Sequence, residues 1–308
     1  MSNLVVVLGP TATGKTKLAV KIANQYKGEI ISADSRQIYK GMDIGTGKDL
    51  KEYQINKNYI LHHLIDILPP KSNYSVYQFK QDFTKIYNSL VKKNKLPILC
   101  GGTGLYIESV LLDYKIPNVG PNDNLRAMLD KNSLNDLIEH LKSIDADKYD
   151  ENYHVTKRRI IRTIEIIKSN KKLNFNQTIK IQNPLIIGLN FEREKLLNNI
   201  QKRLQKRIES GMIEEVQNLI DKGMDLDRLK YFGLEYKFIG QYLFDEIPYQ
   251  DMLEKLNYAI NRFSKRQMTF FRRMEKRGLE ITWVSENNLD LIYKYLNQYL
   301  SKWILTNH

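Results

Sequence analysis

The chain has 308 residues, of which 42% are hydrophobic and 27% charged, so it has the composition of a globular protein with one large domain or two smaller ones. This composition excludes disorder of the whole chain. The longest apolar runs, such as residues 4–8, are far shorter than the roughly 20 residues that cross a bilayer, and the first residues lack a signal-peptide pattern. We therefore expect a cytoplasmic protein with no membrane partner. The single cysteine, Cys100, permits neither an internal disulfide nor a cysteine-rich zinc site.

Charge is the strongest global signal, because 48 Lys and Arg against 35 Asp and Glu leave a net charge of +13. Residues 157–172, 195–207 and 255–277 hold 20 of the 48 basic residues and only two acidic ones. This distribution favours a polyanionic partner such as nucleic acid. Lysine-rich helix faces that are merely solvated remain the alternative.

The first elements expected are a strand over residues 4–8 and a helix from Lys15 through Lys21. Further strands are expected over residues 29–33 and 96–100, and a helical stretch follows over 105–112. Apolar strands that alternate with loops and helices predict an α/β fold with a parallel sheet. Ligands bind at the carboxyl ends of such strands, so the three loops should meet at one site.

The pattern becomes helical between residues 114 and 182. Periodic apolar positions predict helices over 124–141 and 156–168. We predict that residues 114–182 form a helical insertion into a core of residues 1–113 and 183–308. A strand is expected again over 184–189, and the remaining chain is expected to be mainly helical.

Residues 9–16 read Gly-Pro-Thr-Ala-Thr-Gly-Lys-Thr and match all eight positions of the P-loop pattern, between a strand and a helix. The expected core is therefore a P-loop NTPase-like sheet. In a P-loop, backbone N–H groups and the helix N-terminus bind phosphate, the lysine adds a charge and the final hydroxyl reaches Mg²⁺. The motif does not distinguish a nucleotide such as ATP from a diphosphate. We assign phosphate binding, with Thr16 as the magnesium ligand, to Gly9, Thr11, Ala12, Thr13, Gly14, Lys15 and Thr16.

Asp34 follows the second expected strand and should face the P-loop. In a P-loop kinase such a carboxylate binds magnesium or activates an acceptor hydroxyl, whereas in transfer to an amine it accepts the proton that leaves the nucleophile. A cap at the end of the strand is the third interpretation. The residue type and position leave all three open.

Seven motifs recur in the order and approximate spacing of bacterial tRNA dimethylallyltransferases, a family that the chain resembles from about residue 4 to 277. They span residues 9–16, 34–39, 41–48, 62–66, 101–106, 158–162 and 265–267. The resemblance implies transfer of a dimethylallyl group from its diphosphate to N6 of adenine 37, beside the tRNA anticodon. It also implies a need for Mg²⁺ and no consumption of ATP. The partners expected are dimethylallyl diphosphate and the anticodon stem-loop of tRNA, with no obligate protein partner evident.

The resemblance also implies roles for individual residues. Asp34 is expected to be the base on the adenine N6 amine, and Arg203 and Thr16 are expected to act on the diphosphate. Gln267 is expected to be either a structural residue or a substrate contact. The expected tRNA contacts, including Asp34 itself, are Asp34, Ser35, Arg36, Gln37, Thr103, Arg126, Arg158, Arg159, Ile160, Ile161, Arg162 and Gln267.

The sequence departs from the family pattern at two places. Arg207 stands where the family often has Met, and residues 232–237 replace a Gly-Tyr followed by a basic or polar pair, so no role is transferred to them. Three other functions remain as alternatives. They are isopentenyl transfer to free adenylate, a nucleotide kinase, and a non-enzymatic RNA-binding protein.

Overall fold

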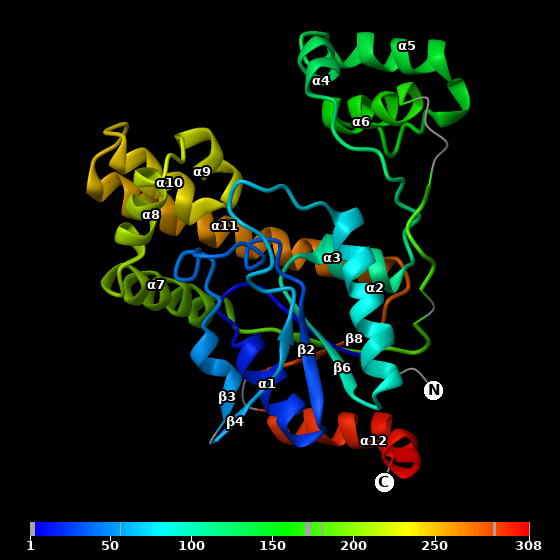
Figure 1. Ribbon diagram of the computed structural model, residues 1–308, viewed down its shortest axis with the longest axis vertical. Coiled ribbons are helices and arrows are strands. Elements are labelled where there is room, and N and C mark those ends of the chain that lie inside the picture. Colours follow the sequence, from blue (N-terminus) through cyan, green and yellow to red (C-terminus); the bar gives the residue numbers. More distant parts are fainter. Residues whose placement is uncertain (1–3, 56, 170–173, 180, 286–287, 308) are drawn as a thin grey trace. The chain divides into compact units, whose positions relative to one another are not determined.

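The computed structural model describes residues 4–307 except 56, 170–173, 180 and 286–287 (Figure 1). The chain divides into two compact units. Residues 1–114 and 179–308 form the first, here called the core unit, and residues 115–178 form the second, called the insertion unit.

The core unit contains a six-stranded sheet in which every strand pairing is parallel. The strand order is β5-β2-β6-β1-β7-β8, which confirms the α/β, P-loop-like fold expected from the sequence. The strands are β1 (Val5–Leu8), β2 (Gly28–Ser32), β5 (His62–His63), β6 (Leu96–Gly101), β7 (Leu185–Leu189) and β8 (Ile281–Val284). A separate antiparallel hairpin joins β3 (Gln54–Ile55) and β4 (Asn58–Tyr59).

The two edge strands, β5 and β8, were not expected, and β8 lies in a part of the chain predicted to be mainly helical. Both strands are too short for their side-chain pattern to distinguish them from loops. Pairing with a neighbour defines them instead. The Trp283 ring of β8 packs over Gly188 of β7, where an added Cβ would lie 2.5 Å from the ring.

The sheet is covered by apolar side chains on both faces, which explains why its strands read as continuous hydrophobic runs. Val6 and Leu8 of β1 point into one core cluster, with α2 (Val76–Lys92) and α3 (Gly104–Leu111). Val5 and Val7 point into the other, with α1 (Lys15–Gln25) and α12 (Leu289–Asn307). Helices on both faces leave the carboxyl ends of the strands as the place for loops.

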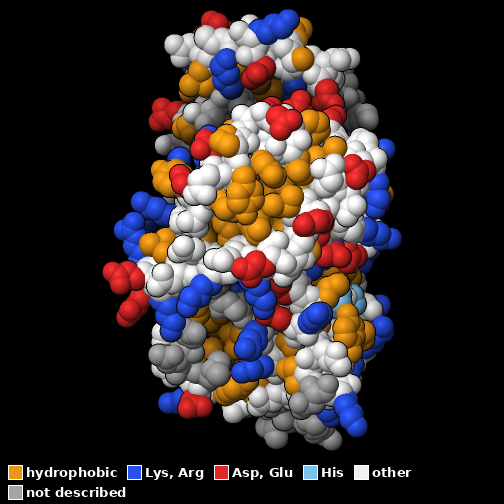
Figure 2. Space-filling model, turned by 90° about the vertical axis from the view of Figure 1, so that its left-hand side faces the viewer, with side chains coloured by type: hydrophobic (Ala, Val, Ile, Leu, Met, Phe, Trp, Pro, Cys, Tyr) orange, Lys and Arg blue, Asp and Glu red, His pale blue; other side chains and the backbone are white. Residues whose placement is uncertain are grey.

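Five consecutive helices follow β7 in the core unit. They are α7 (Arg193–Glu209), α8 (Met212–Asp221), α9 (Leu226–Phe232), α10 (Leu234–Leu243) and α11 (Tyr249–Lys276). The long α11 packs against α10, α7 and α3 and so connects this group of helices to the sheet. Figure 2 shows a patch of hydrophobic side chains on this side of the core unit. Phe244, which follows α10, and Tyr249, at the start of α11, are 43% and 41% exposed.

The insertion unit contains α4 (Asp123–Leu129), α5 (Leu134–Ile144) and α6 (Lys157–Lys168) around a small apolar core. The single helix predicted over residues 124–141 is therefore wrong, because two helices occupy this stretch. Ser133 caps α5 and exchanges hydrogen bonds with Asp136 in a capping box, so it begins a new helix at this point.

Candidate active site

The P-loop follows β1 and leads directly into α1, as the sequence predicted. Gly14, at the N-cap of α1, has φ +74°, a conformation that side chains rarely adopt. A Cβ on Gly9 would lie 2.8 Å from the Leu189 carbonyl oxygen. Thr13 Oγ1 donates to the Pro10 carbonyl at 2.9 Å and closes the loop on itself. Both glycines are therefore required by the backbone that a phosphate site needs.

Lys15 places its charge inside this loop. Its Nζ donates to the Pro10 carbonyl oxygen at 2.6 Å. The pKa of Lys15 is lowered to about 8, mainly by burial and also by the nearby Arg203 charge, while Cys100 and Asp34 oppose the shift. Burial disfavours the charged form of Lys15, and an anion bound beside the ammonium would offset that cost.

Cys100, at the end of β6, is not a nucleophile. Its side chain is buried, and burial raises the pKa of the thiol to about 12. A neutral thiol is the unreactive form.

Gln267 of α11 connects two loops of the site. Its Oε1 accepts a hydrogen bond from the Thr11 N–H at 2.9 Å, and its amide nitrogen donates to the Gly102 carbonyl at 3.0 Å. The side chain lies within the buried face of the helix, where an amide needs both partners. Gln267 was expected to be either a structural residue or a substrate contact, and these two backbone contacts fit the structural role.

The loops after β2 and β6 are joined through Thr103. Thr103 Oγ1 accepts a hydrogen bond from the Ser35 N–H at 3.0 Å, and the Thr103 N–H donates to the Ala33 carbonyl at 3.0 Å. Asp34 lies between these contacts, and its Oδ1 accepts from the Arg36 N–H at 2.9 Å. The loops after the three strands therefore meet at one site, as expected.

Gln37 is held by polar contacts within the core unit. Its amide nitrogen donates to the Gly47 carbonyl at 3.0 Å, and its Oε1 accepts from Ser32 Oγ at 3.0 Å. Arg36 stands over the Tyr231 ring, 5.1 Å from the ring centroid. Gln37 thus ties the segment after β2 to the loop of residues 41–48.

The loop of residues 41–48 is supported by groups that sequence reasoning missed. Both oxygens of Glu215 in α8 accept backbone N–H groups, from Asp43 and Ile44 at 2.7 Å and from Gly45 at 3.0 Å. Lys48 is fully buried and binds the Tyr39 carbonyl at 2.7 Å. Glu215 lies about 170 residues from this loop, so its local sequence carries no signal of the contact.

Arg203 reaches the site from α7. Its Nη2 lies 2.6 Å from Asp49 Oδ2, and its side chain is 33% exposed. Its charge acts on the pKa of Lys15, which places it within electrostatic range of the P-loop. Asp49, its carboxylate partner, was not expected from the sequence.

The burial of side chains in the insertion unit decides which of the expected tRNA contacts are accessible to a ligand. Ile160 and Ile161 are 0% and 6% exposed and pack in the core of this unit, so contact with tRNA through their side chains does not fit their burial. Arg126 and Arg162 both bind the buried carboxylate of Glu165 and are 44% and 29% exposed. The exposed members of the set are better placed to meet a ligand, and among them is Arg158.

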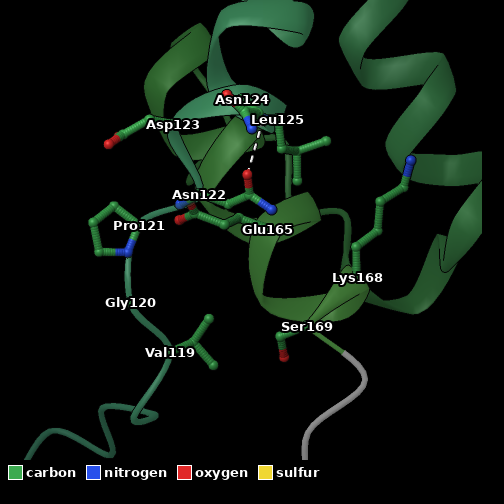
Figure 3. Close-up of a pocket in the computed structure, with 10 residues that line it drawn as sticks. All are labelled: Val119, Gly120, Pro121, Asn122, Asp123, Asn124, Leu125, Glu165, Lys168 and Ser169. Atoms are coloured by element: carbon green, nitrogen blue, oxygen red, sulfur yellow. Dashed lines mark hydrogen bonds between the residues drawn. The ribbon is translucent and has the colours of Figure 1, made fainter.

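A hollow of about 610 Å³ lies within the insertion unit, between residues 119–125 and the end of α6 (Figure 3). Glu165 lines it, with Lys168 and Ser169. The Glu165 carboxylate already accepts hydrogen bonds from Arg126, Arg162 and the Asn122 N–H. The Glu165 carboxylate that lines the hollow is therefore already paired with donors from the protein.

The described residues contain no group of three or more His, Cys, Asp or Glu that could enclose a metal ion. Mg²⁺ bound to a phosphate ligand needs few protein oxygens, because it keeps several waters and takes the rest from the phosphates. Thr16, in the first turn of α1 beside the P-loop, fits that arrangement. Within the same described part of the chain, no helix is long and apolar enough to cross a membrane.

Comparison with known proteins shows the family of the chain. The family model described as IPP transferase matches residues 37–274, and that described as isopentenyl transferase matches residues 2–68. The chain belongs to the IPP transferase family. It is 46% identical to "tRNA dimethylallyltransferase 1" of Azobacteroides pseudotrichonymphae, over 96% of this chain and 97% of that protein. It is 45% identical to "tRNA dimethylallyltransferase 2" of Shewanella sediminis, over 92% and 93%.

Solved structures show the same fold. The full-length tRNA isopentenylpyrophosphate transferase of Bacillus halodurans superposes with a TM-score of 0.70 and 30% identity, over all of both chains. A eukaryotic dimethylallyltransferase acting on tRNA reaches a TM-score of 0.75 at 20% identity, over 94% of this chain and 75% of that chain. The second likeness is evidence for the fold alone.

Proposed function

We propose that this member of the IPP transferase family transfers the dimethylallyl group of dimethylallyl diphosphate to N6 of adenine 37 in tRNA, releasing diphosphate. One observation carries the proposal within the family. Thr103 and Gln267 tie the Asp34 loop and the P-loop to the same turn after β6, so a base and a diphosphate site share one rigid frame.

The P-loop is proposed to bind the diphosphate and to stabilise it as it leaves. The exocyclic nitrogen of adenine is a poor nucleophile, so the reaction depends on making the allylic carbon electrophilic. Lys15, Arg203 and the N–H groups at the start of α1 place positive charge where the leaving group gains negative charge. Mg²⁺ held by Thr16 supplies further neutralisation of the phosphate oxygens when bound.

Asp34 is proposed to accept the N6 proton as the new C–N bond forms. Its Oδ1 is committed to the Arg36 N–H, which holds the carboxylate in position. The Thr103 contact to the next backbone N–H fixes the same turn. A general base held in this way contributes about 10²- to 10⁴-fold to a rate.

The tRNA is proposed to bind through cations and exposed aromatic rings. Along α11, Tyr258 and Phe263 are 64% and 40% exposed, and Arg262 and Arg266 lie 5.8 and 5.9 Å from their ring centroids. Such rings stack on unpaired bases, and the net charge of +13 favours a polyanion. Arg158 and the partly exposed Arg126 are proposed as contacts from the insertion unit.

The test is transfer of radiolabelled dimethylallyl diphosphate, with Mg²⁺ and without ATP, to unmodified tRNA and to AMP in parallel reactions. Label in tRNA alone, abolished by a chelator, is the expected result. Label in AMP alone would move the protein to the free-adenylate class. Absence of transfer to either acceptor would contradict the proposal and return the P-loop to the kinase alternative.

A further inference from the structure

The guanidinium groups of Arg203 and Arg207 lie side by side above Gly47. The two arginines are one turn apart in α7. A Cβ added to Gly47 would lie 1.6 Å from Arg207 Nη2 and 2.7 Å from Arg203 Nη2. The two Nη2 atoms are therefore separated by no more than the sum of these distances. Any side chain at position 47 would occupy the space that both cations use.

Within the described part of the chain, each arginine has one carboxylate partner. Asp49 lies 2.6 Å from Arg203, whereas Glu235 of α10 lies 3.5 Å from Arg207, which is longer than an ordinary charged hydrogen bond. Arg207 is only 13% exposed, and its buried Nε has no hydrogen-bond partner among the residues that the structure describes. A guanidinium offers five N–H donors, and at least the Nε donor of Arg207 is left unpaired by the described residues.

The charges around this pair extend toward the P-loop. Burial lowers the pKa of Arg207, the neighbouring Arg203 charge lowers it further, and Glu235 opposes the shift. The Arg203 charge in turn lowers the pKa of Lys15. Three cations thus influence one another in sequence, Lys15 with Arg203 and Arg203 with Arg207. An anion with several oxygens, bound among them, relieves all of these repulsions together.

We propose that Arg203 and Arg207 form a two-guanidinium clamp on the diphosphate of the prenyl donor, and that Glu235 is a positioning residue that holds Arg207 toward it. The inference rests on the proposed function and adds a second arginine to the diphosphate site. Both places where the sequence departs from the family pattern enter this arrangement, because Arg207 and residues 232–237 meet in the Arg207–Glu235 pair. The clamp and its supporting acid therefore occur together in this chain.

The test compares R207M, E235Q and the double variant R207M/E235Q with wild type. The measurements are the KM for dimethylallyl diphosphate at saturating tRNA, product inhibition by inorganic diphosphate, and the rise in Tm that inorganic diphosphate causes. R207M is expected to raise the KM and the inhibition constant in parallel, each by about tenfold. E235Q should raise both by about threefold, since the arginine remains but is less well held. K202M removes an exposed charge from the same helix and should leave all three values within about twofold.

The double variant separates binding from folding. R207M alone leaves the partly buried Glu235 carboxylate without Arg207 and is expected to lower Tm, whereas R207M/E235Q removes both charges and should recover most of that loss. Its KM should nevertheless stay high. Recovery of both Tm and KM in the double variant would overturn the clamp, as would a wild-type KM in R207M. The diphosphate-induced rise in Tm requires no turnover. A wild-type protein that binds diphosphate but transfers no label therefore refutes the proposed function and leaves the clamp to be judged by R207M.

Discussion

The Gln267 side chain accepts a hydrogen bond from the Thr11 N–H at 2.9 Å, across 256 residues of sequence. The same amide donates to the Gly102 carbonyl. One side chain of α11 therefore holds both the P-loop and the turn after β6. The long helix α11 thus sets the distance between the phosphate site and the turn that carries Thr103.

Replacing Gln267 with Leu should disturb both loops. The change leaves the Thr11 N–H and the Gly102 carbonyl without their partner, and an unsatisfied buried polar group costs about 1–3 kcal/mol. We expect a lower Tm and a KM for dimethylallyl diphosphate raised about tenfold. The matched control is Q250L, which removes an exposed amide from the first turns of the same helix. Equal effects of both substitutions would show that the two loop contacts are unimportant.

Replacing Asp34 with Asn should separate geometry from basicity. The Asn oxygen still accepts the Arg36 N–H, so the loop is retained, but the group no longer takes up a proton. We expect kcat to fall about 10³-fold and the dissociation constant of tRNA to change by less than about threefold. Single-turnover kinetics and filter binding measure the two quantities. A parallel loss of binding and turnover would remove Asp34 from the role of base.

Replacing Thr103 tests the contact between the loops after β2 and β6. T103V keeps the shape of the side chain and removes the acceptor of the Ser35 N–H, whereas T103S keeps the hydroxyl. We expect T103V to lower kcat about tenfold through misplacement of Asp34, and T103S to stay within about threefold of wild type. If both variants behaved alike, the hydroxyl would have no part in positioning Asp34.

Lys15 should make donor binding depend on pH. Its pKa of about 8 in the ligand-free protein means that the ammonium loses its proton above pH 8. Since the diphosphate is attracted to the charged form, the KM for dimethylallyl diphosphate should rise about tenfold between pH 7 and pH 9. In K15R the guanidinium stays charged, so the same rise should be absent. A rise of equal size in K15R would assign the pH effect to another group.

The lowered pKa of Lys15 also determines how its contribution to the free energy of unfolding changes with pH. The pKa of Lys15 is lower in the folded protein than its ordinary value of 10.5, so the unfolded chain holds the proton more tightly. The contribution of Lys15 to the free energy of unfolding therefore increases as pH rises from about 8 to 10.5, and it is fully unfavourable below pH 8. Denaturation of wild type and K15M across this range, without ligand, should differ in slope in that direction.

Glu108 should be a stability determinant of the core unit. Its carboxylate is fully buried. It lies 2.6 Å from Arg273 of α11 and 3.3 Å from Arg277, the residue that follows α11. E108Q leaves both arginines without their counter-charge, and the free energy of unfolding should fall by about 3 kcal/mol. The exposed pair of Glu139 and Lys142 provides the contrast, because E139Q should change stability by less than about 0.5 kcal/mol. Urea denaturation at neutral pH measures both.

The P-loop and the expected strands that form β1, β2, β6 and β7 were predictable because their causes are local. The apolar run of β1, the left-handed Gly14 and the start of α1 all lie within 20 residues. Asp34 was predictable for the same reason, since it comes two residues after the end of the buried strand β2. The break at Ser133 was missed because a capping box also fits the interior of a periodic helical pattern.

The sequence by itself determined the fold class, the phosphate loop, the position of a carboxylate at a strand end and the family of the chain. These depend on backbone conformations and side-chain periods that a few neighbouring residues specify. Only the tertiary structure decided that β8 completes the sheet, that Gln267 joins two loops and that Arg207 meets Glu235. Each of these depends on residues far apart in sequence, whose contact exists only after the core has packed and brought their elements together.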